Sequence, residues 1–475
     1  MAHLDQPVTP IETDPPIPTS TWLALAAAVS SLFLFMIDAG LMSVSRPAME
    51  ADFSGSSRAL LSWASTGYLV AVSSLLLVAG RMADRSGRKR YYLGGVVGFG
   101  CSSVLTALAP TAELLIAARV CQGIAAAFLT SSALALVLPL FPESRRGVVV
   151  GIWGGVGAVA AVIAPTAGGL LIDRAGWRWP FAIVGPMALA VYVVGRRVLI
   201  EQRNPELAKI GDRIGVIIGP AGLGLLALVL SQGRRWGWTS SSTVVIGVVA
   251  VALIAAFIGR CRTIASPLLD LTIFRITAFR AYTSAAACQQ VGFFSWYLTA
   301  PLIFTSLWGW SVLQAGSALA LGQAFAAISG PLGGRWVDRY GPIGPITGSA
   351  LLTALGPIWL ILGVTERPDF WRTFLPATIL IGFGGGICGI LTTGAALGRL
   401  DGAILGAANS LHQLIRRVGG TIGAVLGSTL LGDAIGGKSL LTGARLVWGL
   451  VAVAHLAMCV PLLTATWRRT SDQQR

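Results

Sequence analysis

Residues 80–90 of this 475-residue chain read GRMADRSGRKR, between two long apolar stretches. Five of these eleven positions are Arg or Lys, and one acidic residue, Asp84, stands among them. A weaker copy, GRWVDRYGP, occupies residues 334–342. A charged segment between two apolar runs predicts a short loop that joins two membrane helices, and its repetition predicts a duplicated bundle. The gapless alignment pairs Gly80, Arg81, Asp84, Arg85 and Gly87 with Gly334, Arg335, Asp338, Arg339 and Gly341.

The composition indicates a protein of the lipid bilayer. The chain is 54% apolar and 12% charged, whereas soluble domains carry about 25% charged residues. Apolar stretches of about 20 residues recur, each long enough to cross a membrane, and backbone in lipid must be helical. We therefore predict an all-α integral membrane protein with about fourteen spans. They lie near residues 21–42, 60–79, 91–110, 113–139, 147–172, 180–199, 214–231, 243–259, 279–306, 312–333, 343–364, 374–397, 411–432 and 443–466.

The spacing of the two charged segments predicts the domain organisation. They start 254 residues apart, but six spans with short loops need only about 200 residues. The extra residues can hold the seventh and eighth predicted spans, between residues 214 and 259. We expect two six-helix halves with two inserted helices between them. The expected divisions are a tail at 1–20, a half at 21–199, a linker with the two extra helices at 200–278, a half at 279–466 and a tail at 467–475.

The net charge of +15 would indicate nucleic-acid binding in a soluble protein. Here the basic residues lie in short loops beside apolar spans, so we expect no nucleic-acid partner. Loops on the side of residues 80–90 hold 22 Lys and Arg, against 10 on the other side. The positive-inside rule then places both termini in the cytoplasm of a multi-pass protein of the cell membrane. The first twenty residues contain no Lys or Arg, which argues against a secretory signal.

The motifs of soluble enzymes and metal sites are missing from the sequence. Its six cysteines are scattered, without CxxC or Cys/His spacing, so we expect neither metal nor disulfide frame. Residues 384–389 match GxGxxG but lie inside an apolar span that no strand precedes. P-loop, HExxH and GxSxG motifs do not occur. We therefore expect no enzyme activity, no cofactor and no use of ATP.

One carboxylate lies well inside an expected span. Asp38 is about four residues from the outer end of the first span, and Arg119 about six residues into the fourth, so both lie roughly 6–9 Å below the outer surface. An ionisable group in lipid is costly and normally faces a cavity or a partner. Separating the two charges would favour protonation of the carboxylate. Proton coupling and a purely structural ion pair both remain open.

The chain resembles the major facilitator superfamily, in its fourteen-span drug:proton antiporter branch, at residues 80–90, 119–123, 164–169, 177–179 and 297–316. Residues 80–90 are similar to the family's loop between spans two and three, and residues 119–123 (RVCQG) resemble RxxQG. Residues 164–169 (APTAGG) resemble GPxxGG, although Ala164 replaces the first glycine. The first-span motif, at residues 37–47, keeps only the Asp and the Pro. The resemblance covers nearly the whole chain.

The resemblance implies a proton-coupled exporter of small amphiphilic compounds that works by alternating access. In the family the first and fourth spans are neighbours, so Asp38 and Arg119 are the expected coupling pair. Alternatives that remain are a facilitator or importer, and a non-transporting membrane sensor. The implied conformational switch, which docks the two halves, comprises Gly80, Asp84, Arg85, Gly87, Arg88, Asp338 and Arg339. The implied hinge of the fifth span, where ordinary helix packing is the alternative, comprises Pro165, Gly168 and Gly169.

Polar and aromatic residues of later spans are candidates for a substrate cavity near the middle of the membrane. Polar contacts that only join helices are the alternative for the same residues. We expect Arg416 and Arg417, two turns from the cytoplasmic surface, to extend toward that surface. The cavity candidates are Gln122, Gln289, Gln290, Trp296, Tyr297, Asn409, His412 and Gln413.

Overall fold

The computed structural model describes residues 17–142, 145–203, 212, 214–264, 267–269, 271–310, 312–365, 367, 369–398, 400, 402–431 and 437–464. This part of the chain is helical and contains no strand. Short helices are α2 (Arg58–Leu61) and the segments η1 (Leu138–Leu140), η4 (Leu271–Arg275), η5 (Ile303–Leu307) and η6 (Phe370–Phe374). The long helices are α1 (Thr19–Asp52), α3 (Trp63–Ser86), α4 (Arg88–Leu108), α5 (Ala112–Val137), α6 (Arg146–Ala175), α7 (Arg178–Val198), α8 (Gly215–Trp236), α9 (Ser241–Thr263), α10 (Thr277–Leu302), α11 (Val312–Tyr340), α12 (Ile343–Gly363), α13 (Leu375–Leu397), α14 (Gly402–Leu431) and α15 (Gly437–Ala457).

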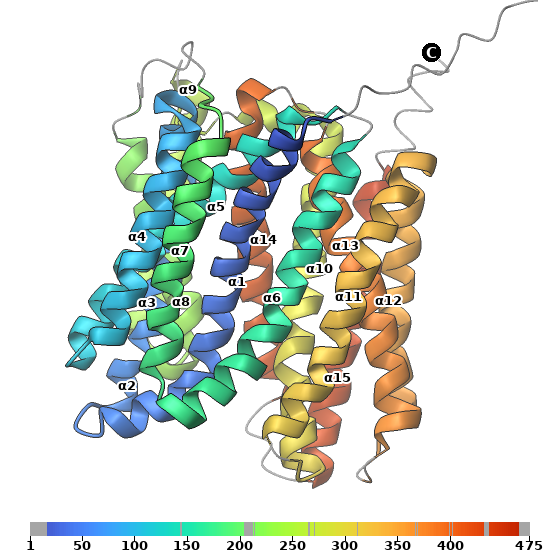
Figure 1. Ribbon diagram of the computed structural model, residues 1–475. Coiled ribbons are helices and arrows are strands. Elements are labelled where there is room, and N and C mark those ends of the chain that lie inside the picture. Colours follow the sequence, from blue (N-terminus) through green and yellow to red (C-terminus); the bar gives the residue numbers. More distant parts are fainter. Residues whose placement is uncertain are drawn as a thin grey trace, which may run out of the picture.

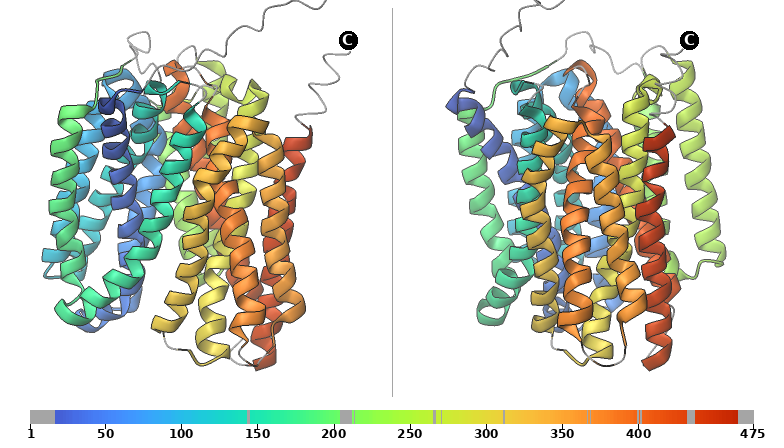
Figure 2. Two further views of the ribbon diagram at one scale, coloured as in Figure 1. Left: turned by 45° about the vertical axis from the view of Figure 1, so that its right-hand side comes forward. Right: turned by 90° about the vertical axis from the view of Figure 1, so that its right-hand side faces the viewer.

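The long helices form two bundles that stand side by side (Figure 1). We call α1 to α7 the N-terminal half and α10 to α15 the C-terminal half. Across the boundary, α3 and α5 pack against α14, and α6 packs against α11 and α13. The start of α1 and the end of α15 lie at the same end of the bundle (Figure 2). The ribbons of the two halves diverge toward the opposite end (Figure 2, left).

Each expected span coincides with one long helix, which confirms the helical fold. Within the described residues, eleven helices are long and apolar enough to cross a membrane. Several helices are longer than we predicted; for example, α1 continues to Asp52, and α14 begins at Gly402 instead of near residue 411. Polar and charged residues continue a helix beyond the apolar run, so hydropathy alone underestimates its length.

The charged segment at residues 80–90 is not a loop, contrary to our prediction. Helix α3 continues through Ser86 and α4 begins at Arg88, so Gly87 alone separates them. Its φ of 116° is a conformation that side chains with a Cβ rarely adopt. Gly341 has a φ of 74° at the matching place after α11. The sequence repeat is thus a repeated helix–glycine–helix turn.

Two helices, α8 and α9, lie in the segment where we expected the inserted pair. Helix α8 packs on α3 and also touches α14, and α9 packs on α8. Asp212, before α8, accepts a hydrogen bond of 2.5 Å from Nε of Arg260, near the end of α9. Many valines of α9 are exposed, as expected of a helix that faces lipid.

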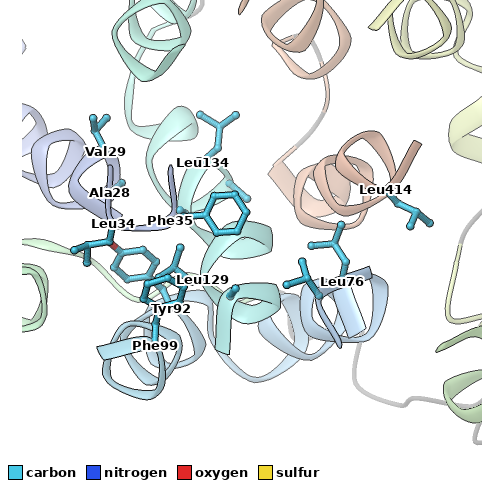
Figure 3. Close-up of a cluster of buried hydrophobic side chains, with 14 of the residues drawn as sticks. Ala28, Val29, Leu34, Phe35, Leu76, Tyr92, Phe99, Leu129, Leu134 and Leu414 are labelled. Carbon is cyan, nitrogen blue, oxygen red and sulfur yellow. The ribbon is translucent and has the colours of Figure 1, made fainter. Parts of the chain in front are cut away.

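The largest apolar core cluster continues from one half into the other. Phe35 of α1, Tyr92 of α4 and Leu129 of α5 fill the interior of the N-terminal half (Figure 3). The hydroxyl of Tyr92 donates to the carbonyl of Ala27 at 2.7 Å, so this buried polar group is satisfied. Leu414 of α14 belongs to the same cluster and extends it to the C-terminal half.

Candidate functional site

The structure brings Asp38 of α1 and Arg119 of α5 into direct contact. Nη1 of Arg119 lies 2.7 Å from Oδ1 and 2.9 Å from Oδ2 of Asp38. Gln122 joins them, since its Nε2 donates to Oδ1 of Asp38 at 2.9 Å and its Oε1 accepts from Nη1 of Arg119 at 2.6 Å. All three side chains are fully buried. This charge cluster includes Gln122, which we had assigned to the substrate cavity.

The RVCQG sequence explains how α5 positions the cluster. Arg119 and Gln122 are three residues apart, so they share one face of the helix. Gly123 lies against α3, where a Cβ would come within 2.5 Å of the carbonyl oxygen of Tyr68. This close approach places the ring of Tyr68 under the Arg119 guanidinium, 4.5 Å from the ring centre. Arg119 and Gln122 thus have contacts that need their side chains, and Gly123 has one that needs its lack of a side chain.

The hydrogen bonds of the cluster converge on the carboxylate of Asp38. Asp38 accepts three hydrogen bonds, two of them from a cation, and a charged acceptor strengthens such bonds. Addition of a proton to Asp38 would turn one acceptor oxygen into a donor and remove its attraction to Arg119. The link between α1 and α5 therefore depends on the charge of one buried group.

Asp84 is buried, although we expected the segment that holds it to be a loop between two helices. It lies on the last turn of α3, and Nε of Arg88 donates to its Oδ1 at 2.7 Å. Nη1 of Arg88 reaches the carbonyl of Ala135 on α5 at 3.1 Å. Helix α3, which carries Asp84, packs against α14 of the C-terminal half. Asp84 is therefore on a helix that lies along the boundary between the halves.

Glu201 completes the turn at Gly87, which sequence reasoning missed. Its carboxylate accepts from the backbone N–H groups of Lys89, at 2.9 Å, and Arg90, at 3.2 Å, and so caps the start of α4. A Cβ on Gly87 would lie 2.7 Å from the Glu201 carboxyl carbon. Gly87 is thus required for both its conformation and its space. Gly80 is buried on α3, and Arg85 is exposed.

At the second charged segment, α11 runs through Arg339 to Tyr340, and the Arg339 guanidinium lies over the ring of Tyr340 at 5.4 Å. The side chain of Asp338 lies outside the described residues.

The segment that resembles GPxxGG lies within α6, which is helical throughout. A Cβ on Gly168 would lie 2.5 Å from Cδ2 of Leu41 on α1, whereas Gly169 has open space. The side chain of Pro165 lies outside the described residues. The segment therefore packs the N-terminal half together, three residues beyond Asp38 on α1.

Contacts between the halves come from an earlier stretch of α6, which we had not singled out. A Cβ on Gly154 would come within 2.0 Å of Cγ1 of Ile390 on α13. A Cβ on Gly151 would lie 3.2 Å from the carbonyl oxygen of Gly330 on α11. Nη1 of Arg146 donates to the carbonyl of Gly398 at 2.5 Å. The halves thus meet closely at the end of the bundle that carries the Gly87 turn.

The other cavity candidates do not gather in one place. His412 is fully buried, with both ring nitrogens within 3.1 Å of threonine hydroxyls, Thr283 on α10 and Thr393 on α13. Asn409 donates to the carbonyl of Ser131 on α5 at 3.1 Å, a bond between the halves. These two residues join helices in this structure.

Two aromatic candidates on α10 also differ in their surroundings. Trp296 is buried in a separate aromatic cluster with Phe374, whose ring centre is 5.8 Å away. Tyr297 is exposed and stacks on Phe293. Gln289 is buried, and Gln413 is half-buried on α14.

Arg416 and Arg417 do not extend to the cytoplasmic surface, which corrects our expectation. Because α14 begins at Gly402, the two arginines lie four turns into the helix instead of two. Nη2 of Arg416 is 3.5 Å from Oε1 of Gln290. The Arg417 guanidinium lies over the ring of Phe35 of α1, 5.1 Å from its centre.

Comparison with known proteins gives a single family. The model of the Major Facilitator Superfamily matches residues 28–211 and 283–475. The chain is 32% identical to multidrug resistance protein Stp of Mycobacterium tuberculosis, over 86% of this chain and 75% of that one. It is 31% identical to puromycin resistance protein pur8 of Streptomyces alboniger, over 86% and 81%. It is 28% identical to the tetracenomycin C resistance and export protein of Streptomyces glaucescens, over 87% and 77%.

Solved structures show the same fold at low sequence identity. The proton:xylose symporter XylE superposes with a TM-score of 0.65 and 16% identity, covering 94% of this chain and 95% of that one. The human organic anion transporter MFSD10 superposes with a TM-score of 0.64 and 14% identity, covering 94% and 100%.

Proposed function

The chain belongs to the Major Facilitator Superfamily, and from that premise we propose that it exports small amphiphilic compounds in exchange for protons. Its relatives are named as antibiotic and multidrug resistance or export proteins, which supports the substrate class and the direction. Asp38 carries the proposal, because it is a fully buried carboxylate held by a cation on a second helix.

In the proposed cycle, Asp38 alternates between an ionised and a protonated state. While ionised, it holds α1 against α5 through Arg119 and Gln122. Protonation removes the charge attraction between Asp38 and Arg119, so α1 and α5 are free to change their relative position. Because α1 also packs on α6 through Leu41 and Gly168, a change at Asp38 reaches the helix that touches the C-terminal half.

The gate of the proposed cycle lies at the end that carries the Gly87 turn. Gly154 and Ile390 pack there without a gap, and Arg146 bonds to Gly398. Asp84 and Arg88 fix the α3–α4 turn beside α14. We propose that these contacts form when this end closes and separate when it opens.

The proposed topology has fourteen spans in the cell membrane, with residues 200–278 supplying two helices outside a twelve-helix core. The family match leaves out residues 212–282, which supports this division. Basic residues concentrate on the side of the Gly87 turn, which supports cytoplasmic termini. Ser86 is exposed at that turn. In a variant without native cysteines, Ser86→Cys should react with an impermeant maleimide only after the cells are permeabilised; labelling of intact cells would reverse the topology.

The proposed function is tested by uphill transport in proteoliposomes. Purified protein is reconstituted, a pH gradient is imposed, and movement of each compound in a panel of fluorescent amphiphiles is followed. Accumulation against a concentration gradient, abolished by a protonophore, supports proton-driven export. Movement that only equalises concentrations, with no response to the pH gradient, would indicate a facilitator instead.

A further inference from the structure

Two adjacent arginines lie near the middle of the membrane. Arg416 is fourteen residues after the first residue of α14, or about 21 Å along the helix axis. The apolar span of this helix covers Ala407–Leu431, so both arginines lie well inside it. A cation at this depth is costly and normally marks a pathway or a partner. Neither arginine belongs to the coupling pair or to the gate.

Neither arginine is paired with an acidic side chain among the described residues. Within the described part of the chain, the partners of Arg416 are neutral, Thr393 at 3.3 Å and Gln290 at 3.5 Å, both long hydrogen bonds. Nε of each arginine is buried and has no hydrogen-bond partner in the same part of the chain. A guanidinium has five N–H donors, so several donors at this place are unused.

The other deep cations are neutralised. Arg119 contacts Asp38, and Arg88 contacts Asp84. Asp38 accepts both of its short bonds to cationic nitrogen from Arg119, and its third bond comes from Gln122. Among the described residues, Arg416 and Arg417 therefore have no acidic side chain in direct contact.

The surroundings of the pair come from both halves. Phe35 belongs to α1 of the N-terminal half, whereas Gln290 and Thr393 belong to α10 and α13 of the C-terminal half. Both arginine residues are half-buried, so part of each remains exposed. A site that touches both halves changes shape when the halves move, as alternating access requires of a substrate site.

We propose that Arg416 and Arg417 form a subsite for the carboxylate of an amphiphilic substrate. A carboxylate accepts two parallel bonds from a guanidinium, which the unused donors can supply. Phe35 would then lie against the apolar body of the substrate. This inference rests on the proposed function for the identity of the ligand as a transported compound, but its test does not require transport.

The test measures equilibrium binding to the full-length protein in lipid nanodiscs, without a pH gradient. The probes are three fluorescent carboxylates, dansylglycine, dansylphenylalanine and pyrenebutyrate, each beside its uncharged methyl ester. Binding to empty nanodiscs is subtracted. We expect at least one acid to bind about tenfold or more tightly than its ester, the gain expected of a charge-assisted contact.

The double variant Arg416→Gln/Arg417→Gln should lose this preference and keep its affinity for the ester, which also shows that it is folded. Replacement of both residues by Lys should keep part of the preference, because the charge stays and the planar fork is lost. Arg262→Gln, at an exposed arginine at the end of α9, is the matched control and should bind like the unchanged protein.

The proposal is overturned if no acid binds better than its ester, or if the double Gln variant keeps the preference. Absence of uphill transport beside a clear acid preference would refute proton-driven export and leave the subsite standing. Uphill transport without any acid preference would support proton-driven export and refute the subsite.

Discussion

Arg119 contacts both carboxylate oxygens of Asp38 through a single nitrogen, Nη1, and the pair is closed off from solvent. Nε of Arg119, which could supply the second bond of a fork, has no hydrogen-bond partner among the described residues. A one-nitrogen contact is less strongly fixed than a two-nitrogen fork. The geometry thus suits a pair that separates and forms again during a cycle.

Asp38→Asn is expected to abolish proton-driven transport. Asn has the shape of the protonated acid and cannot ionise, so the variant is held in one state of the cycle. Binding of substrate, measured by fluorescence titration, should stay within a few-fold of the unchanged protein. Asp38→Glu, which can still ionise, should keep some activity. Uphill transport by Asp38→Asn at an ordinary rate would refute the role of Asp38.

The packing of Gly154 against Ile390 predicts a defect that a second change repairs. Gly154→Ala places a methyl group on Ile390, and overpacking of this kind costs about 1–3 kcal/mol. If the contact exists only when this end is closed, the equilibrium between states shifts by roughly tenfold. We expect a several-fold lower transport rate for Gly154→Ala in proteoliposomes, and recovery in the double variant Gly154→Ala/Ile390→Ala.

The control for this prediction is Gly157→Ala, on the same helix. Its new Cβ would lie 3.5 Å from Leu32, an ordinary contact, so its rate should be unchanged. A double variant as slow as Gly154→Ala alone would show that the defect lies in α6 and not in its packing on α13.

The end of α1 and the start of α7 are joined by a pH-sensitive contact. Asp52 accepts hydrogen bonds from Arg178 and from Nε1 of Trp177. The bond from Arg178 holds the pKa of Asp52 below its usual value. The contact therefore stabilises the fold above the unfolded pKa of about 3.9 and is lost as the pH falls through the lower folded value.

Asp52→Asn should accordingly lower the melting temperature at pH 7 only slightly, since half-exposed pairs contribute about 0.2–1 kcal/mol. The difference from the unchanged protein should shrink as the pH is lowered below about 4. Scanning fluorimetry in detergent between pH 7.5 and pH 3.5 measures both. A difference that stays constant over this range would show that the charge of Asp52 does not contribute.

Much of the helical fold could be predicted from hydropathy, and the errors have a common cause. Each long apolar run became a helix, but hydropathy does not show where a helix ends outside the lipid. The residues GRMADRS therefore looked like a loop, although they continue α3 to Ser86. The late start assigned to α14 likewise placed Arg416 and Arg417 near the surface. A helix propensity is present in such charged segments, but it is a weaker signal than the apolar pattern.

The site was predictable only where one residue was chemically unusual. Asp38 was recognised as the deep acid, and depth suggested Arg119 as its partner. By contrast, Gly154 and Ile390 are ordinary residues more than 200 positions apart in the sequence. Nothing in their local pattern marks a contact between halves, and the same holds for Gly87 and Glu201. Such contacts depend on how whole helices pack.

The last prediction concerns Asp84, which is paired within its own half and lies on a helix that packs against the other half. Arg88 contacts Asp84, and α3, which carries Asp84, packs against α14 of the C-terminal half. Asp84→Asn keeps the shape but removes the charge, which leaves the buried Arg88 guanidinium without its anion. If Asp84 latches the closed end, transport should fall several-fold while expression and membrane insertion stay near normal.

Spin labels at Ser86→Cys and Tyr340→Cys, both exposed at this end of the bundle, should move to longer distances in Asp84→Asn. Arg90→Gln, at an exposed neighbour on α4, is the matched control and should leave the distances unchanged. Lower transport with unchanged label distances would instead mean that Asp84 and Arg88 only fix the local turn between α3 and α4.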